Sequence, residues 1–425
     1  MDQNLALLYQ PGSLQTTKPK FNSNLEALRA IAALVVVWHH TIVHPFQLDP
    51  NFAPTGTANF NPPGHFAVLI FFILSGYVIG LAHHKPLTTW SSVKIYVRKR
   101  FTRIYPIYAV SLIFAVVVSG FKYSIITTLG HLIFCQIIWV PLIFENNPLW
   151  SLQYEMLFYL LFIPLSSLRI SPILVTIVSI FLSFITAYLA NRGIGGTSYS
   201  YFVGFSFWAL GWALGTVPTS PSINYRKLIS ALLLLLAIGY FNVLQSAYTK
   251  MATIIMPMIV KPTVSSEWPE SFISPIDFAA LPFALLIILQ FINYENKYFR
   301  WTAIILYILP AYTLIYIARN FPKENTSTAL LPILFYIISV FIFFYKSEIL
   351  ERCSKYIISK IGLIGSISYG LYVIHFPIIS IFHRITIFSG SIKTFSIRFV
   401  IYAILSIATA YWLEKKFQPF IKKIL

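Results

Sequence analysis

Two ionisable side chains lie eleven residues apart in the first apolar segment of the chain. Arg29 and His40 both fall within residues 25–43, a stretch rich in Ala, Leu, Ile and Val. Eleven helical residues return to within about 20° of the starting face after a rise of about 16 Å, so the two side chains share one helical stripe. Because ionisable groups in hydrocarbon are usually functional, this pair predicts a catalytic site in which the imidazole acts as acid, base or nucleophile.

A basic cluster follows the second apolar segment, at Arg98, Arg100 and Arg103. Arg100 and Arg103 are three residues apart and therefore lie on one helical face, where two guanidinium groups suit bidentate binding of phosphates. The alternative interpretation is that this run only sets the membrane topology or binds anionic lipid headgroups.

Two further polar sites interrupt apolar segments. Glu155 lies near the start of a segment that opens at Trp150, and it shares a helical face with Ser151 and Tyr159. His375 lies inside a segment near the end of the chain. Each residue alone is explained by a hydrogen bond between helices, but together they predict a polar site within the membrane.

The composition determines the environment of these residues. Hydrophobic residues make up 57% of the chain and charged residues 10%, whereas about 25% of residues are charged in a soluble domain. This excludes a soluble globular protein. The net charge of +18 follows the expected distribution of Lys and Arg on the cytoplasmic side, so it predicts no nucleic-acid partner. The two cysteines form no metal-binding spacing, and we expect no metal.

The apolar segments predict an all-α, polytopic transmembrane helix bundle. About thirteen stretches are long enough to cross, and basic residues near both termini place both ends in the cytoplasm, which requires an even number of spans. Residues 125–143 are the weakest stretch because they contain His131 and Gln136, so we interpret them as re-entrant or interfacial. We therefore expect about 12 spans, within a range of about 10 to 13. The expected organisation is a cytoplasmic tail (1–24), a membrane domain (25–414) and a basic cytoplasmic tail (415–425).

Several sequence blocks, in this order, resemble the integral-membrane acyltransferase 3 family of bacteria. They are residues 25–34 with His40, 71–77, 98–106, Trp150-Ser151-Leu152 with Glu155, Ser368-Tyr369 with His375, and 411–414. Two positions depart from the family pattern, at Glu26-Ala27 and at Ala67-Val68-Leu69. These departures weaken any role for a carboxylate in the second helix and leave the Arg29 and His40 pair intact.

The resemblance implies an enzyme of the bacterial inner (cytoplasmic) membrane. Its expected reaction is transfer of an acyl group, commonly acetyl, from acetyl-CoA or another acyl-CoA to a hydroxyl of a glycan or lipid-linked sugar. The expected catalytic residues are His40, Arg29, Glu155 and His375. Arg98, Arg100 and Arg103 are expected to bind the donor, and Trp150, Ser151 and Tyr369 the substrate. The alternative function is a transporter or flippase for a lipid-linked sugar, and the oligomeric state stays open.

Overall fold

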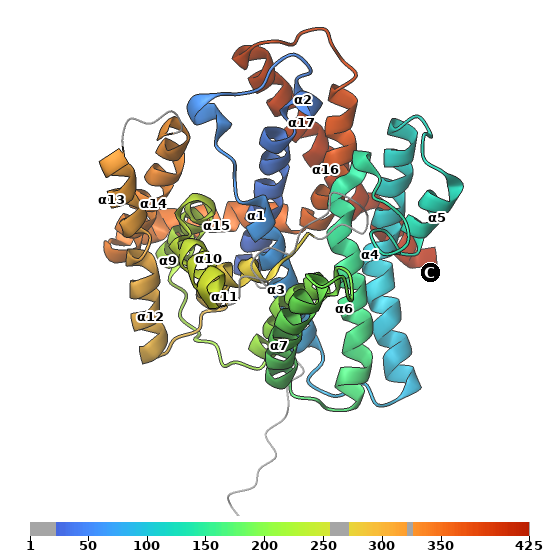
Figure 1. The fold of residues 1–425 in the computed structure, drawn as a ribbon, viewed down its shortest axis with the longest axis horizontal. Coiled ribbons are helices and arrows are strands. Elements are labelled where there is room, and N and C mark those ends of the chain that lie inside the picture. Colours follow the sequence, from blue (N-terminus) through green and yellow to red (C-terminus); the bar gives the residue numbers. More distant parts are fainter. Residues whose placement is uncertain (1–22, 256–271, 321–325, 425) are drawn as a thin grey trace, which may run out of the picture.

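The computed structural model describes residues 23–255, 272–320 and 326–424. Of the predicted N-terminal tail, only Ser23 and Asn24 fall within them. The described residues contain helices and no β-strand, apart from one isolated bridge between Gln136 and Val140, so the all-α class is confirmed (Figure 1).

The first half of the chain contains α1 (Ser23–Val43), α2 (Pro45–Leu48), η1 (Gly56–Asn59), α3 (Gly64–Ala82), α4 (Trp90–Val118), α5 (Ile125–Leu132), η2 (Phe144–Leu149), α6 (Trp150–Ser167), α7 (Pro172–Ala190) and α8 (Ser198–Leu214). The second half contains α9 (Tyr225–Phe241), α10 (Val243–Ile255), η3 (Pro275–Ala280), α11 (Leu281–Phe291), α12 (Lys297–Ile308), α13 (Ala311–Asn320), η4 (Thr326–Ala329), α14 (Leu330–Phe344), α15 (Glu348–Gly365), α16 (Ser368–Phe382), α17 (Ile392–Trp412), η5 (Leu413–Phe417) and α18 (Gln418–Ile424).

The helices establish a multi-pass membrane protein. Among the described residues, 7 helical segments are long and apolar enough to cross a membrane, and two bent helix pairs raise the number to 9. The predicted count of about 12 spans is therefore not confirmed. One reason is length: α8 has 17 residues and α11 has 11, whereas a crossing needs about 20 residues.

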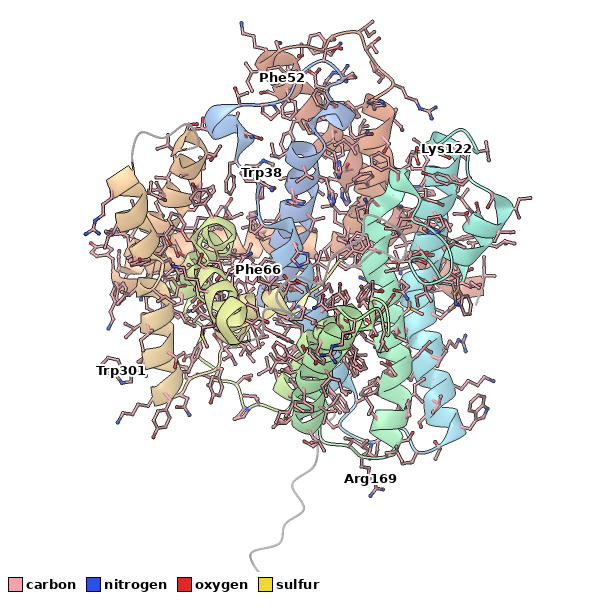
Figure 2. All side chains as sticks on the ribbon, viewed as in Figure 1. Trp38, Phe52, Phe66, Lys122, Arg169 and Trp301 are labelled. Atoms are coloured by element: carbon pink, nitrogen blue, oxygen red, sulfur yellow. The ribbon has the colours of Figure 1, made fainter. Side chains whose placement is uncertain are left out.

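Residues 125–143 contain only the eight-residue helix α5. Such a helix is about 12 Å long, too short to cross a bilayer, which agrees with the prediction of a segment that does not cross. Two of its polar side chains bond inside the protein: the Gln136 amide donates to the carbonyl of Leu149 at 3.1 Å, and Nε2 of His131 lies 3.1 Å from the carbonyl of Pro141. Lys122, just before α5, and Arg169, after α6, lie at opposite ends of the molecule (Figure 2).

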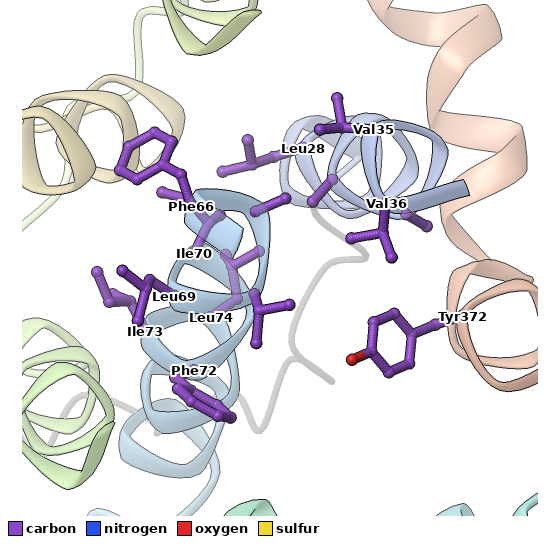
Figure 3. Packing of buried hydrophobic residues seen from close by; sticks show 14 of the residues in the cluster. Leu28, Val35, Val36, Phe66, Leu69, Ile70, Phe72, Ile73, Leu74 and Tyr372 are labelled. Atoms are coloured by element: carbon purple, nitrogen blue, oxygen red, sulfur yellow. The ribbon is translucent and has the colours of Figure 1, made fainter. Parts of the chain in front are cut away.

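Helix α1 lies near the centre of the bundle, against α3, α15 and α16 (Figure 1). Small residues permit this close packing: Ala27, Ala30, Ala32 and Ala33 are fully buried. Leu28 of α1 points toward Phe66 of α3, and Tyr372 of α16 points toward the space beside Val36 of α1 and α3 (Figure 3).

Helices α3 and α8 touch through their backbones. A Cβ atom on Gly76 would collide with the carbonyl of Trp208, and one on Gly211 would collide with the carbonyl of Ile73. This contact fixes α3, and with it Ser75, at the edge of the cavity described below.

The C-terminal residues 415–424 continue the helical structure of α17. The chain passes through a π-helical turn, η5, and then through α18. Glu414 and Gln418 are buried, and both bond to Arg103 of α4. The C-terminal segment therefore packs against α4 at Arg103 instead of extending away from the protein.

Candidate functional site

A cavity of about 520 Å³ opens between α1, α3, α4, α6 and α16, and we call it the large cavity. Five cationic side chains line it: Arg29, Lys99, Arg100, Arg103 and Lys422. Glu26 and Glu155 are its carboxylates, and the rest of the lining combines valine, leucine, isoleucine and phenylalanine side chains with those of serine and tyrosine. The structure thus brings together six residues that the sequence predicted as site residues: Arg29, Arg100, Arg103, Ser151, Glu155 and Tyr369.

Arg100 is held by aromatic rings. Its guanidinium carbon lies 6.0 Å from the ring centroid of Tyr96 and 5.8 Å from that of Tyr159. It forms no ion pair with a described residue, and its Nε is buried without a hydrogen-bond partner. A half-buried guanidinium with an unpaired, buried N–H donor is suited to bind an anionic ligand.

Arg103 is positioned by the C-terminal segment. Its Nη1 donates to Glu414 at 2.8 Å and to Gln418 at 3.2 Å, and its guanidinium carbon lies 5.7 Å from the ring centroid of Tyr369. Its side chain is 41% exposed, whereas that of Glu414 is 2% exposed. Arg98 of the same helix does not line the large cavity in the described structure.

Arg29 does not contact His40. It donates to Glu26, one turn earlier on α1, at 2.7 Å. Arg29 therefore belongs to the cationic end of the large cavity, while His40 lies eleven residues further along the same helix, a rise of about 16 Å.

Glu155 is fixed by hydroxyl groups. One of its oxygens accepts hydrogen bonds from Ser75 at 2.6 Å and from Tyr159 at 2.6 Å, and the indole of Trp208 donates to Ser75 at 3.3 Å. Glu155 and Tyr159, which share a helical face by spacing, are thus in direct hydrogen-bond contact. Ser151, on that face by spacing, bonds instead to the hydroxyl of Tyr372 at 2.6 Å.

His40 and His375 meet in space although 335 residues separate them in sequence. Nδ1 of His40 lies 3.1 Å from Nε2 of His375 and 3.0 Å from the carbonyl of Val36. His375 is fully buried, and its Nδ1 lies 3.2 Å from the carbonyl of Leu371.

These contacts determine where the protons lie when both rings are neutral. A carbonyl only accepts, so Nδ1 of His375 carries its proton and Nε2 is left as an acceptor. Nδ1 of His40 must then carry the proton that it shares between Val36 and His375. Nε2 of His40 therefore keeps a free lone pair, as a general base requires.

Tyr372 connects the large cavity to the histidine pair. It lines the cavity, and its ring centroid lies 6.1 Å from that of His375, one helical turn further along α16. Trp150 does not line the large cavity; its ring stacks on Phe272 at 4.8 Å between centroids.

Some residues at the site carry no local sequence signal. Tyr372 looks like an ordinary member of an apolar helix, and Lys422 lies in the basic terminal segment. Ser75 and Glu414 fall within the blocks 71–77 and 411–414, but the sequence assigned neither of them a role at the site. Only long-range packing brings them to the cavity. Within residues 23–255, 272–320 and 326–424, no group of three or more His, Cys, Asp or Glu side chains is arranged to hold a metal ion.

Comparisons with known proteins agree with this arrangement. The profile of the acyltransferase 3 family, described as an acyltransferase domain, matches residues 22–345. A curated relative, acyltransferase MdmB of Streptomyces mycarofaciens, is 30% identical over 151 residues, which cover 33% of this chain and 38% of the relative. No solved structure matches the chain.

The family profile covers most of the chain, including α1, the arginines of α4, and Glu155. Tyr369 and His375 lie beyond the matched residues, and they join the site through the packing of α16. This chain belongs to the acyltransferase 3 family.

Proposed function

We propose that the protein transfers an acyl group, with acetyl as the expected group, from cytoplasmic acyl-CoA to a hydroxyl of an exported or cell-surface glycan or its lipid-linked precursor. The observation that carries this proposal is the large cavity, which has cationic groups at one end and Tyr372 and Ser151 at the other. Acyl-CoA matches this arrangement of charge, because a long neutral pantetheine arm separates its phosphates from the thioester.

The donor's phosphates would bind at the cationic end. Arg100 has an unused buried donor, and Arg103 is oriented by Glu414, so both are suited to phosphate oxygens. Lys99 and Lys422 add charge at the same end. The apolar wall would then take the pantetheine arm.

The thioester would lie near Tyr372, next to the histidine pair. Nε2 of His40 removes the proton of the acceptor hydroxyl as its oxygen attacks the thioester carbonyl carbon. The carbon–sulfur bond then breaks, the acyl group stays on the acceptor oxygen, and the proton passes from His40 to the CoA thiolate. Alternatively, Nε2 of His40 attacks the thioester carbonyl first, the carbon–sulfur bond breaks and CoA leaves as the thiolate. The acceptor oxygen then takes the acyl group from Nε2, and the hydroxyl proton passes to the thiolate.

His375, Glu155 and Arg29 would act in support of this chemistry. Nε2 of His375 accepts a hydrogen bond from Nδ1–H of His40, which keeps the lone pair of His40 on its Nε2. Glu155 and Arg29, with its partner Glu26, border the donor path. Ser151 and Tyr369 would contact the donor. The family membership favours this enzyme over the alternative of a transporter or flippase.

The cellular setting is part of the proposal. We infer that the protein lies in the bacterial inner membrane with both termini in the cytoplasm, so that the cationic end of the large cavity meets acyl-CoA. The distribution of Lys and Arg along the sequence supports this orientation.

The test uses purified protein in sealed vesicles of known orientation. Acyl-CoA is supplied on either the inner or the outer side, and release of CoA thiol is measured with and without a glycan acceptor on the opposite side. We expect thiol release only when acyl-CoA is on the side of Arg100. Release with donor and acceptor both confined to the other face contradicts the proposed path, and no release from either side contradicts the use of acyl-CoA.

A further inference from the structure

We propose that a second cavity, which His39 of α1 lines, binds a neutral sugar unit of the acceptor; this rests on the proposed function. The cavity has a volume of about 240 Å³, and we call it the small cavity. Its polar lining consists of His39, Asn61, His65, Asn242, Gln245 and Asp277. Phe66, Leu69 and Ile238 supply part of its apolar wall.

The polar groups of the small cavity suit hydroxyl ligands. The amides of Asn61, Asn242 and Gln245 each offer both donors and an acceptor, as sugar hydroxyls do. The only described cation-forming groups are histidines, because no Lys or Arg lines this cavity. The lining therefore differs from that of the large cavity, where five cationic side chains favour phosphates. A neutral, hydroxyl-rich ligand matches the small cavity better than an anionic one.

A hydrogen bond between His65 and Asp277 gives the small cavity a fixed polar wall. Nε2 of His65, at the start of α3, lies 2.9 Å from Oδ1 of Asp277, at the start of η3. The other oxygen of Asp277 accepts a hydrogen bond from the backbone N–H of Ser274 at 2.8 Å. Asp277 is thereby held in place, while the side chain of His65 is still 41% exposed.

The small cavity borders the same elements as the proposed reaction site. On α1, His39 lines the small cavity, while its neighbour His40 contacts His375. The ring centroids of His39 and His40 are 5.3 Å apart. On α3, Leu69 lines the small cavity and Val68 the large one. Neighbouring residues of α1 and α3 therefore border the histidine pair and the two cavities.

Neighbouring residues at the start of α6 also lie next to the two cavities. The ring of Trp150 stacks with His65 of the small cavity at 6.5 Å between centroids, and the next residue, Ser151, lines the large cavity. A ligand in the small cavity is thus adjacent to the end of the donor path. This placement is what transfer between two separately bound substrates needs.

The volume limits the size of the bound unit. Pockets for drug-sized ligands measure about 300–1,000 Å³, so a cavity of about 240 Å³ fits a smaller group. We assign it to a single sugar ring, with the remainder of a glycan outside the cavity.

The test compares two variants of neighbouring residues on α10. Gln245→Trp places an indole at the small cavity, whereas Ser246→Trp adds the same side chain at an exposed position that does not line it. Both replaced side chains are exposed, so neither change enters the core. The probe is a mixture of methyl glycosides of neutral hexoses. Its binding to the full-length protein is measured by saturation-transfer NMR, and its KM by release of CoA thiol from acetyl-CoA.

We expect wild-type protein and Ser246→Trp to bind the glycosides alike. In Gln245→Trp we expect at least about a tenfold weaker binding and a correspondingly higher glycoside KM, with the KM for acetyl-CoA unchanged. Equal binding by the two variants overturns the assignment of the small cavity. Wild-type protein that releases CoA thiol but binds no glycoside overturns the neutral-sugar class.

The two proposals fail in different ways. Glycoside binding that Gln245→Trp weakens, without any thiol release from acetyl-CoA, keeps the small cavity as a sugar site and contradicts the proposed acyl-CoA chemistry. Thiol release with no effect of Gln245→Trp keeps that chemistry and removes the sugar site.

Discussion

The histidine pair gives its two members different expected roles. Nε2 of His40 has the free lone pair, whereas His375 has both ring nitrogens engaged, one with the Leu371 carbonyl and one with His40. His40 is therefore the residue that we expect to touch the reacting atoms. His375 is expected to act through His40, as a positioning residue.

His40→Ala should reduce acyl transfer by about 10²- to 10⁴-fold, because it removes the positioned acid and base. The measurement is CoA thiol release by purified protein, with binding of acyl-CoA as the check that the large cavity is intact. The control is His84→Ala, which changes an exposed histidine in the loop between α3 and α4. Similar rates for His40→Ala and His84→Ala would remove His40 from the mechanism.

His375→Gln should lower kcat while leaving the KM for acyl-CoA unchanged. Glutamine removes the imidazole acceptor that orients Nδ1 of His40, so the pH profile of kcat should also shift. A variant with reduced kcat and an unchanged pH profile would show that His375 has only a packing role.

The two arginines of the large cavity should differ in their response to replacement by lysine. Arg100→Lys should raise the KM for acyl-CoA by about 10- to 100-fold, because a charged hydrogen bond contributes about 1.5–3 kcal/mol and lysine lacks the planar fork. Arg103→Lys should have a smaller effect, since Arg103 already bonds to Glu414 and Gln418.

Arg98→Lys is the matched control, because Arg98 lies on the same helix and does not line the large cavity. All three replacements keep the positive charge and therefore the topology signal. Equal, wild-type KM values in all three variants would favour the alternative interpretation, in which the basic run only sets topology or binds lipid.

At the scale of secondary structure, a polar cluster outside the membrane segments ties the turn after α4 to η2. Glu145 of η2 accepts hydrogen bonds from Lys122 at 2.7 Å and from Tyr123 at 2.7 Å. Burial by itself raises the pKa of Glu145, but the hydrogen bonds from Lys122 and Tyr123 outweigh it, so the pKa is lowered. The element that follows η2 is α6, which carries Ser151 and Glu155.

The cluster should make stability depend on pH in the acidic range. Because the folded state lowers the pKa of Glu145, its contribution is present above the unfolded value of about 4.3 and is lost as the pH falls through the folded value. Glu145→Gln should therefore lower the melting temperature at pH 7, by a small amount because Lys122 is 52% exposed.

The measurement is the melting temperature in detergent between pH 7 and pH 3, for wild type and for Glu145→Gln. The difference between the two proteins should shrink as the pH falls. A difference that stays constant down to pH 3 would show that the carboxylate charge does not contribute.

At the scale of the whole molecule, the proposed path requires a fixed orientation. Arg192 follows α7 and is expected outside, whereas Lys355 lies on α15 and is expected on the cytoplasmic side. In protein whose Cys135 and Cys353 are changed to serine, Arg192→Cys should react with an impermeant thiol reagent applied to intact cells. Lys355→Cys should react only after the membrane is opened.

Labelling of both positions from outside would contradict the assigned orientation. It would also disconnect the cationic end of the large cavity from cytoplasmic acyl-CoA. Opposite sides for the two positions also require an odd number of membrane crossings between them.

The sequence by itself determined the class of the protein and the local chemistry of its helices. Hydropathy is a sum over neighbouring residues, so the membrane environment and the all-α class follow from composition and segment length. The shared face of Arg100 and Arg103 and the contact of Tyr159 with Glu155 follow from the helical period. The number of spans did not follow from the sequence, because broken, bent and short helices have the same apolar composition as complete spans.

The tertiary structure alone decided which of these groups act together. Spacing placed Arg29 and His40 on one stripe, yet Arg29 pairs with Glu26 at the large cavity, and His40 meets His375 instead. The small cavity depends on contacts between residues more than 200 positions apart, such as His65 with Asp277. A helical period fixes which face a residue occupies, but the partner of that face is set by how whole helices pack, and this is why the site's long-range pairs became visible only in the fold.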